Sequence, residues 1–325
     1  MKLLLALTFA SITLHAASST DWPRFLGPTG AALAPESKAP LKWSDSENVL
    51  WKSEMPGPGS SSPIVLGDKV FITCWSGYGD ASGSDDMTKL TRHLVCLSRT
   101  DGKLLWDAKV PSTVAEDPWQ GFITEHGYAT HTPVTDGERV YVFFGKSGAL
   151  AFDLDGKQLW QTSCGTSSGD RRWGSAASPV LAGDVLVINA NDESMAIIGL
   201  DKKTGKQLWR AKGEFGMAYG TPALYQRDGL TDLVIAVPME IWGMNPETGK
   251  LRWFAPHGMS GNVSPSIIFW RKHGLRLRWL SCHTQCRAKN RWQRRPRSRL
   301  RALEQQHQLL CAHAASQGRP SFCRQ

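Results

Sequence analysis

The stretch DKKTGKQLW, Asp201–Trp209, decides the fold, because the chain repeats nearly the same turn and tryptophan. RTDGKLLW ends at Trp106, LDGKQLW at Trp160 and NPETGKLRW at Trp253. With Trp51 included, successive tryptophans lie 44 to 55 residues apart. A repeat of this period is the signature of a propeller or a solenoid, in which each unit buries its apolar faces against its neighbours.

Each turn is followed by a small residue, a Ser or Thr, a Pro and then an apolar run. Proline can open a strand because its missing N–H costs no ladder hydrogen bond there. Short GD, DG or AGD turns lead into β-branched and aromatic runs such as VFITC and VYVFF, which are typical of strands. The pattern predicts four short antiparallel strands per unit, the blade of a β-propeller. The prolines are Pro63, Pro133, Pro179, Pro222 and Pro265.

The repeated tryptophan has a structural interpretation. A blade exposes two apolar faces, and one large ring at a fixed place in each blade can bridge to the next blade. Burial of such a ring is worth a few kcal/mol, at about 25 cal/mol per Å². A ligand cage is the weaker alternative, because these rings belong to the repeat itself. We therefore predict inter-blade docking by Trp51, Trp106, Trp160, Trp209 and Trp253.

The Asp-x-x-Thr-Gly-Lys-x-x-Trp pattern resembles the tryptophan-docking motif of pyrroloquinoline-quinone (PQQ)-type repeat proteins. The resemblance covers residues 41–268, and the lead-in segment 19–40 holds DWPRFLGPTGAAL, which looks like the start of exported members. The family includes quinoprotein alcohol dehydrogenases and BamB-type outer-membrane assembly scaffolds. It implies an all-β propeller, usually of eight blades, of which four to five are expected in this chain.

The N-terminus predicts export. Lys2 precedes the apolar run LLLALTFASITL and the small residues HAASST, as in a signal peptide over residues 1–18. The cleavage region has no cysteine for a lipid anchor, and no internal apolar run is long enough to span a membrane. We expect a periplasmic or secreted bacterial protein.

Residues 269–325 differ from the rest of the chain. They hold fourteen Lys and Arg residues but one acidic residue, Glu304, whereas the whole chain has a net charge of +9. They also lack strand alternation and a rhythm of turn glycines. Three interpretations compete: a basic nucleic-acid arm, a zinc knuckle built on Cys282, His283 and Cys286, and translation in the wrong frame. No aromatic platform accompanies the charge, and the cysteine spacing fits no common zinc pattern.

The genetic code favours the third interpretation. Shifted forward by one nucleotide, Arg287–Trp292 can read Ala-x-Lys-Thr-Gly-Gly, Leu303 can read Trp, and Cys311–Ala314 can read Ala-His-Thr-Pro. The hidden tryptophan lies 50 codons after Trp253 and the hidden proline 49 codons after Pro265. The order and spacing match the repeat. We therefore expect a frameshift near residues 269–271 that truncates the propeller.

The segments just before each Ser/Thr-Pro should meet at one mouth of the central channel. They read EHGYATHTP, RRWGSAASP, MAYGTP and SGNVSP. Aromatic and cationic side chains gathered there suit a protein partner or a small anionic or planar ligand, while polar capping of the blade ends explains them equally well. The candidate residues are Glu125, His126, Tyr128, His131, Arg171, Arg172, Trp173, Met217 and Tyr219.

The resemblance also implies that an enzyme of this family would bind PQQ and calcium through Glu, Asn and Asp near the channel, often beside adjacent cysteines. The body has only the separated Cys74, Cys96 and Cys164, of which the first two could pair after export or lie buried as small hydrophobes. Asn189 and Asp192 look peripheral. We expect a non-catalytic binding or assembly scaffold, with a PQQ- and calcium-dependent alcohol or sugar dehydrogenase as the alternative, and no catalytic residue or metal site is assigned.

Overall fold

The computed structural model describes residues 21–34, 37–80, 83–213, 218–227, 229–269 and 275–276. All of them belong to the unit Met1–Arg287. The expected signal peptide, nearly all of the basic tail, and Met217 lie outside these residues.

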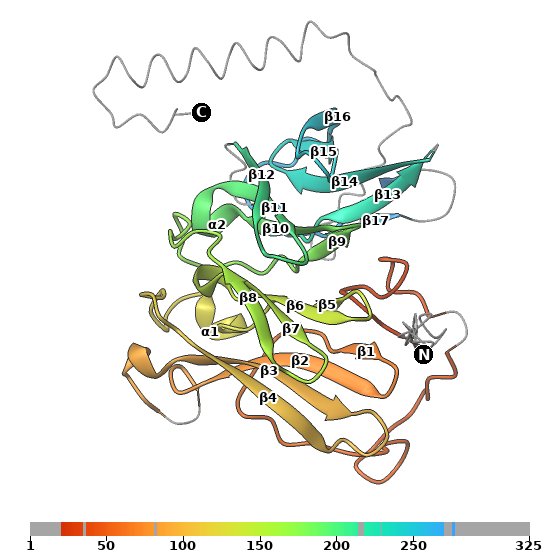
Figure 1. The fold of residues 1–325 in the computed structure, drawn as a ribbon, viewed down its shortest axis with the longest axis vertical. Helices are drawn as coiled ribbons and strands as arrows, with labels where there is room; N and C mark the ends of the chain where they lie inside the picture. The colour runs from red at the N-terminus through yellow and green to blue at the C-terminus, as the bar shows by residue number, and fades with distance from the viewer. Residues whose placement is uncertain are drawn as a thin grey trace, which may run out of the picture. The chain divides into compact units, whose positions relative to one another are not determined.

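The described chain is nearly all β and forms four successive four-stranded antiparallel sheets, each built from consecutive strands (Figure 1). The described residues therefore form four complete blades of a β-propeller, the fold that the repeats predict. Blade 1 holds β1 (Ile64–Leu66), β2 (Lys69–Ser76), β3 (Thr91–Ser98) and β4 (Leu104–Pro111). Blade 2 holds β5 (Val134–Thr135), β6 (Arg139–Phe143), β7 (Ala149–Asp153) and β8 (Gln158–Thr162). Blade 3 holds β9 (Val180–Ala182), β10 (Val185–Ala190), β11 (Ala196–Asp201) and β12 (Gln207–Lys212). Blade 4 holds β13 (Ala223–Arg227), β14 (Leu230–Val237), β15 (Glu240–Met244) and β16 (Leu251–Pro256).

A fifth blade begins after blade 4. β17 (Ile268–Phe269) pairs with β18 (Leu275–Arg276) in an antiparallel ladder. Short helical turns occupy some of the loops: η1 (Met87–Lys89), α1 (Ile123–His126), η2 (Gly145–Ser147) and α2 (Asn191–Ser194).

The core lies between blades rather than within them. One cluster joins Phe71 and Cys96 of blade 1 to Phe152 of blade 2, and each further pair of blades shares a similar cluster. Because a single sheet cannot cover both of its faces, each blade depends on its neighbours for burial.

The repeat tryptophans reach from one blade to the turn of the next. The indole N–H of the first four donates to a backbone oxygen one or two residues after the third strand of the following blade, so the contact joins two repeats. Trp51 Nε1 reaches Arg99 O at 2.8 Å, Trp106 reaches Leu154 O at 3.0 Å, Trp160 reaches Lys202 O at 3.1 Å, and Trp209 reaches Pro246 O at 2.9 Å. Trp253 Nε1 donates instead to Asp232 Oδ2 of its own blade, at 2.7 Å. The turn that would follow Trp253 lies outside the described residues.

The glycine of each turn completes the joint. A Cβ added at Gly102, Gly156, Gly205 or Gly249 would overlap the ring of Trp51, Trp106, Trp160 or Trp209, respectively. These glycines also have positive φ angles, +66° at Gly249 for example, which side chains rarely adopt. The repeated turn and the repeated tryptophan are thus the two halves of one contact, made between neighbouring repeats.

The same tryptophans explain one of the body cysteines. The residue paired across the ladder with each tryptophan from Trp106 onward is small, and Cys96 fills this place opposite Trp106. Cys74 packs in a different cluster, beside Trp51 and Met55, and both thiols are free and buried. Burial raises the pKa of Cys74 to about 12 and that of Cys96 to about 11, so neither thiol is reactive at neutral pH.

The Ser or Thr before each first strand forms a second inter-blade link. Its hydroxyl oxygen accepts a hydrogen bond from the backbone N–H of the matching residue in the preceding blade. The bonds run from Ser62 N to Thr132 Oγ1 (3.0 Å), Thr132 N to Ser178 Oγ (3.0 Å), Ser178 N to Thr221 Oγ1 (2.9 Å) and Thr221 N to Ser266 Oγ (3.1 Å). In the fifth blade Ser266 takes this role, so the matching position lies two residues after Ser264, the residue before Pro265.

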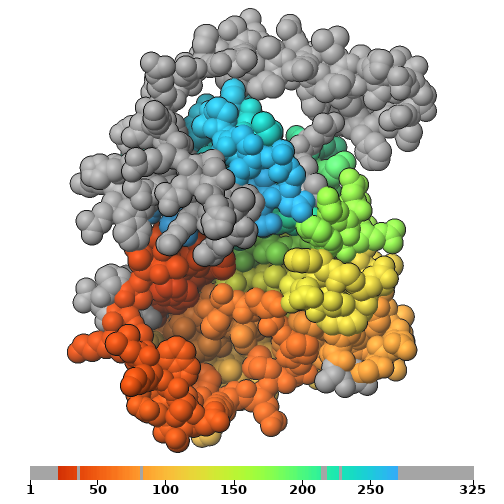
Figure 2. Space-filling model, turned by 180° about the vertical axis from the view of Figure 1, so that it is seen from behind, coloured from red at the N-terminus to blue at the C-terminus, as the bar shows by residue number. Residues whose placement is uncertain are grey.

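The lead-in segment lies along the first strands of the blades. Trp22 and Val65 of β1 exchange two backbone hydrogen bonds of 2.9 Å, and Thr135 N donates to Pro23 O at 2.9 Å. Residues 24–26, 29 and 30 then line a small pocket together with residues at the first strands of blades 3 to 5. Figure 2 shows this segment, in red, against the neighbouring blades. The lead-in segment therefore contacts the first strands of several blades without belonging to any of the four-stranded sheets.

We expect Thr132→Val to destabilise the chain by about 1–3 kcal/mol, because Val keeps the shape but leaves the N–H of Ser62 without its acceptor. Thr132→Ser keeps the hydroxyl and should cost no more than about 1 kcal/mol. Urea unfolding of both variants measures the difference. Equal costs would remove the proposed role of the hydroxyl.

We expect Gly249→Ala to destabilise more than Gly183→Ala by about 1–3 kcal/mol. Both glycines have similar φ angles, +66° and +62°, but a Cβ at Gly183 meets nothing within 4 Å. The comparison therefore isolates overlap with the Trp209 ring from backbone strain.

Trp209→Ala should cost about 3–5 kcal/mol. Urea unfolding free energies test both values, and a Trp209→Ala cost below about 1 kcal/mol would argue against docking.

Candidate functional site

The loops between blades and the loops between second and third strands meet at one end of the sheets. These loops carry most of the residues that the sequence singles out, together with α1, η2 and α2 (Figure 1). They build two features: a partly exposed row of aromatic rings and a buried polar pocket.

This row, called here the aromatic ridge, consists of the exposed Phe122 and the half-buried Trp173 and Tyr219. The ring centres of Phe122 and Trp173 are 4.9 Å apart, and those of Trp173 and Tyr219 are 6.1 Å apart. The Arg171 guanidinium carbon lies 5.0 Å from the centre of the Trp173 ring, within reach of a cation–π interaction. His126 Nε2 bonds to Trp173 O at 2.7 Å and fixes the loop that carries the ridge.

The other predicted residues lie apart from the ridge. Glu125 and Arg172 are exposed. Tyr128 is buried among Trp75, Tyr78 and Trp119, and its O–H donates to Asp117 O at 2.7 Å. His131 is also buried and lines the pocket. The structure thus brings together His126, Arg171, Trp173 and Tyr219, adds Phe122, and separates Tyr128 and His131 from them.

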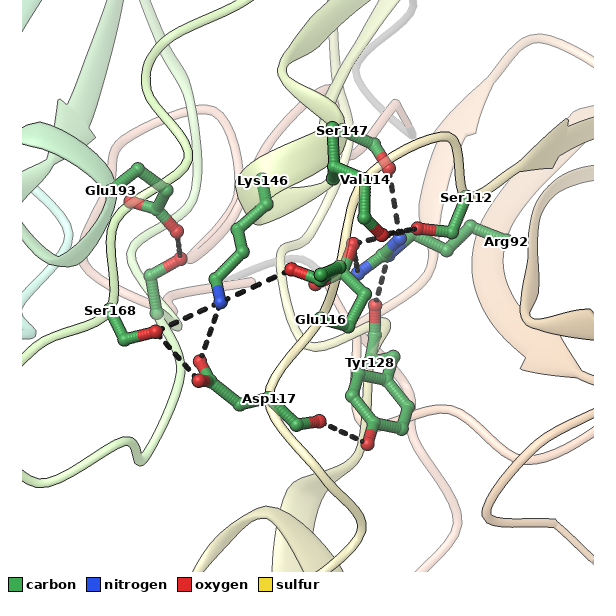
Figure 3. A network of polar contacts seen from close by, with 12 residues as sticks. Arg92, Ser112, Val114, Glu116, Asp117, Tyr128, Lys146, Ser147, Ser168 and Glu193 are labelled. Carbon is green, nitrogen blue, oxygen red and sulfur yellow. Dashed lines mark hydrogen bonds and ion pairs between the residues drawn. The ribbon is translucent and has the colours of Figure 1, made fainter. Parts of the chain in front are cut away.

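Two buried ion pairs form one wall of the pocket (Figure 3). Arg92 on β3 meets Glu116 at 2.9 Å and donates to Tyr128 O and to Ser147 Oγ. Arg92 belongs to blade 1, Ser147 belongs to blade 2, and Glu116 lies in the link between these blades. The contacts of Arg92 therefore connect blade 1 to blade 2.

The second ion pair joins Lys146 on η2 to Asp117, with 3.2 Å between Nζ and Oδ2. Ser168 bridges the two, accepting from Lys146 Nζ at 2.9 Å and donating to Asp117 Oδ1 at 2.6 Å. Both charged side chains are buried, and buried ion pairs are costly to break because one partner is left uncompensated.

The opposite wall carries the acids Asp192 and Glu193, and the nearby charge of Lys146 lowers the pKa of Asp192 less than burial raises it. Glu193 on α2 bonds to the Ser175 hydroxyl, which also contacts His131 Nε2 at 3.1 Å. Burial raises the pKa of Glu193 to about 8 and, with the nearby charge of Asp117, raises that of Asp192 to about 7. Burial also lowers the pKa of His131 to about 3, so this imidazole is neutral at physiological pH and a weak base.

The pocket does not fit the PQQ and calcium that the family resemblance implies. Its free volume is about 40 Å³, far below the roughly 300–1,000 Å³ of pockets for drug-sized ligands. Lys146 and Arg92 also place two cations where a calcium ion would have to sit. Within the part of the chain that the structure describes, no three His, Cys, Asp or Glu side chains are grouped to hold a metal ion.

Comparison with known proteins gives a family match over the part of the chain that forms the blades. The family model of outer membrane protein assembly factor BamB matches residues 44–214 and 165–266. These ranges cover more than half of the chain. The chain belongs to this family.

Several solved structures resemble this BamB-family chain. The quinohemoprotein alcohol dehydrogenase from Comamonas testosteroni has a TM-score of 0.50 at 14% identity, over 80% of this chain and 46% of its own. BamB from Moraxella catarrhalis has a TM-score of 0.44 at 16% identity, over 67% and 54%. Quinohemoprotein alcohol dehydrogenase ADHIIG from Pseudomonas putida HK5 has a TM-score of 0.47 at 15% identity, over 70% and 40%.

The chain therefore spans about half the length of these solved structures. At such identities the likeness shows the fold alone. No curated protein matches the chain in sequence. Among the described residues, no helix is long and apolar enough to cross a membrane.

Sequence reasoning missed the acids of the pocket in this BamB-family chain. Asp192 looked peripheral, but it is 6% exposed, and Asn189 is 2% exposed. The amide of Asn189 donates to Ala218 O at 3.0 Å, which links β10 to the start of blade 4. The available signal was the run NDES (Asn191–Ser194), two residues after the apolar VLVI of β10, which marks a loop but not the direction in which its acids point.

A further polar chain crosses blade 1. Ser76 Oγ lies 2.8 Å from His93 Nε2, and His93 Nδ1 lies 2.9 Å from Asp107 Oδ1. The same atoms connect in acyl-transfer triads. However, the N–H of Gly77, the next backbone donor along the chain, already bonds to Asp80 Oδ2 at 2.7 Å. We interpret the chain as a cross-strand ladder that stabilises β2, β3 and β4.

The raised pKa of Glu193 predicts a pH-dependent stability. Its folded value of about 8 exceeds the usual 4.5, so the folded state holds the proton more tightly, and this contribution is lost as the pH rises through about 8. Glu193→Gln removes the titration. We expect it to gain on the order of 2 kcal/mol over the wild type between about pH 5 and pH 9.

Urea unfolding across this pH range measures the effect, and Glu125→Gln, at an exposed position, is the matched control. A pH profile of Glu193→Gln parallel to that of the wild type would show that Glu193 ionises normally.

Proposed function

We propose that this chain is a non-catalytic scaffold that holds a protein partner against the aromatic ridge. The ridge carries the proposal: three rings from three successive inter-blade links align, with Arg171 on Trp173. Phe122 is 52% exposed. Aromatic and Arg side chains are the residues that most often dominate the energy of protein interfaces.

The state of the polar groups supports a scaffold rather than a dehydrogenase. Arg92 and Lys146 are each committed to a carboxylate, and His131 is a weak base because burial lowers its pKa to about 3. The misfit of the pocket to PQQ and calcium argues in the same direction. These ion pairs connect loops of different blades and so hold the ridge in place.

Site-directed photo-crosslinking tests the ridge. A photoreactive residue at 122 or 173, in protein incubated with an extract of the producing cells, should give one discrete protein adduct. The adduct should be lost with Arg171→Ala, and the same residue at Leu104, an exposed site 59% accessible on β4, should give none. Equal adducts from both places, or none from the ridge, would contradict the proposal.

The alternative function, a PQQ- and calcium-dependent dehydrogenase, can be tested directly. We expect no saturable binding of PQQ with calcium, measured by PQQ fluorescence, and no alcohol-dependent dye reduction. Saturable binding together with turnover would overturn the non-catalytic role.

We also propose that the protein is exported and that the reading frame changes near residues 269–271. The run from Lys2 to Thr20 supports export, and Ser266, which still makes the repeat contact of a fifth blade just before the basic tail, supports the frame change. N-terminal sequencing of the mature protein should begin between Ala16 and Ser19. Resequencing of the gene should reveal further Trp and Thr-Pro units in the next frame; an unchanged frame without them would refute the shift.

A further inference from the structure

We propose that protonation of Asp192 and Glu193 holds the aromatic ridge in place, and that their ionisation releases the loop that carries it. This loop, called here the ridge loop, spans residues 165–175 and includes Arg171 and Trp173. The consequence for a partner rests on the proposed scaffold function, whereas the movement of the loop does not depend on any partner.

The ridge loop closes directly over both acids. Ser167 N donates to Glu193 O at 3.0 Å, and the Ser175 hydroxyl donates to the Glu193 carboxylate. A Cβ added at Gly169 would lie 2.7 Å from Asp192 Oδ1, closer than real Cβ atoms approach. The loop is therefore built around the two side chains near both of its ends and at its middle.

The closed arrangement keeps water away from one oxygen of each acid. Asp192 Oδ2 and Glu193 Oε2 are buried and have no hydrogen-bond partner in the described part of the chain. Burial of an ionised carboxylate at such a place is far costlier than burial of the neutral acid. About 40 Å³ is free beside them, close to the roughly 30 Å³ that one water occupies in the liquid. The closed pocket is therefore too small to hydrate two carboxylates.

The charged groups that face the acid pair do not offset both of its charges. The acids among them are Glu116 and Asp117, in the link between blades 1 and 2, and Asp170 in the ridge loop. The bases are Arg92 on β3, Lys146 on η2, His131 before β5 and Arg210 on β12. Arg92 and Lys146 are each paired with another carboxylate, and His131 is neutral because burial lowers its pKa to about 3.

Both acids consequently take up protons near neutral pH. Burial and the charge of Asp117 raise the pKa of Asp192 to about 7, although Lys146 lowers it. Burial and the charge of Asp192 raise the pKa of Glu193 to about 8, despite the hydrogen bond from Ser175. Because both values exceed those of exposed acids, bound protons stabilise the closed loop. This stabilisation is lost as the pH rises through about 7 to 8.

The ridge loop, rather than α2, is the part that can move. α2 connects β10 and β11, which pair along their whole length from Val185 to Asp201, whereas residues 163–176 belong to no helix or strand. Arg172 in this loop has a φ of +51°, a strained angle for a residue with a side chain. Opening of the loop would admit water to both carboxylates and relieve this strain.

Movement of the loop changes the ridge because Trp173 is its middle ring. The loop is tied to α1 by the hydrogen bond from His126 Nε2 to Trp173 O. The charge of Asp192 also acts on a second ring, since burial and this charge raise the pKa of Tyr219 to about 12. We therefore expect the three rings to align below about pH 7 and to separate above about pH 8.

Fluorine NMR of the full chain labelled with 5-fluorotryptophan tests the movement without a partner. The signal of Trp173 is assigned by its loss in Trp173→Phe, and the signal of Trp209, buried between blades, is assigned in the same way as an internal control. We expect the Trp173 signal to shift or broaden with a midpoint between about pH 7 and pH 8. The Trp209 signal should stay unchanged.

Variants of the acids identify the groups that titrate. Asp192→Asn and Glu193→Gln each keep one side chain neutral, so each should reduce the pH-dependent change of the Trp173 signal by about half or more. The double variant should abolish it. Glu125→Gln, at an exposed position, should leave it as in the wild type.

A Trp173 signal that is constant from about pH 6 to pH 9 would overturn the proposal. An unchanged titration in the double variant would also overturn it, because another group would then be responsible. Equal movement of the Trp209 signal would do the same, since it would show general unfolding. The wild-type titration decides the matter even where a variant of the acids fails to fold.

Crosslinking from position 122 separates this proposal from the scaffold role. Adducts should fall about tenfold or more between about pH 6.5 and pH 8.5. Equal adducts at both pH values would overturn the regulation of the ridge. No adduct at either pH value, with the titration of Trp173 intact, would contradict the scaffold role and support the movement of the loop.

Discussion

The structure depends on the contact between a tryptophan of one blade and the turn glycine of the next. The indole ring covers the glycine, and its N–H donates to a backbone oxygen of the same turn, as for Trp160 with Lys202 O at 3.1 Å. A four-stranded blade cannot bury both of its faces, so its stability depends on such joints. The contact also explains why the turn and the tryptophan recur together: each repeat supplies one half of two different joints.

Polar links act alongside this apolar contact. The hydroxyl of the Ser or Thr before each first strand satisfies an N–H of the neighbouring blade, and the Arg92–Glu116 and Lys146–Asp117 pairs join loops at one end. Hydrogen bonds of this kind add little net stability when made but are costly when one partner is lost. They set the position of each blade relative to the next, and so the position of the aromatic ridge.

The sequence allowed the fold to be predicted because its signal is local and repeated. The Trp–Gly turn, the Ser/Thr-Pro strand starts and the hairpin turns all lie within one repeat, and four copies remove the ambiguity of any one. The direction of docking, from Trp209 to the turn at Gly249, could not be read, since it depends on how repeats pack. The fifth strand start was misplaced by two residues, because Pro265 imitates the motif while Ser266 makes the contact.

The site was predicted less completely, because its geometry depends on where each loop turns. His126, Arg171, Trp173 and Tyr219 were expected at one end of the blades and do gather there. Tyr128 and His131 lie on the same stretch of sequence but point into the interior. Asp192 and Glu193 follow a buried strand, and nothing local shows that α2 turns them inward beside Lys146. A double-mutant cycle between Trp160 and Gly205 tests the central contact most directly. If the ring of Trp160 covers Gly205, Gly205→Ala should cost at least about 1 kcal/mol less in a Trp160→Ala background than in the wild type. Equal costs in both backgrounds would contradict the account.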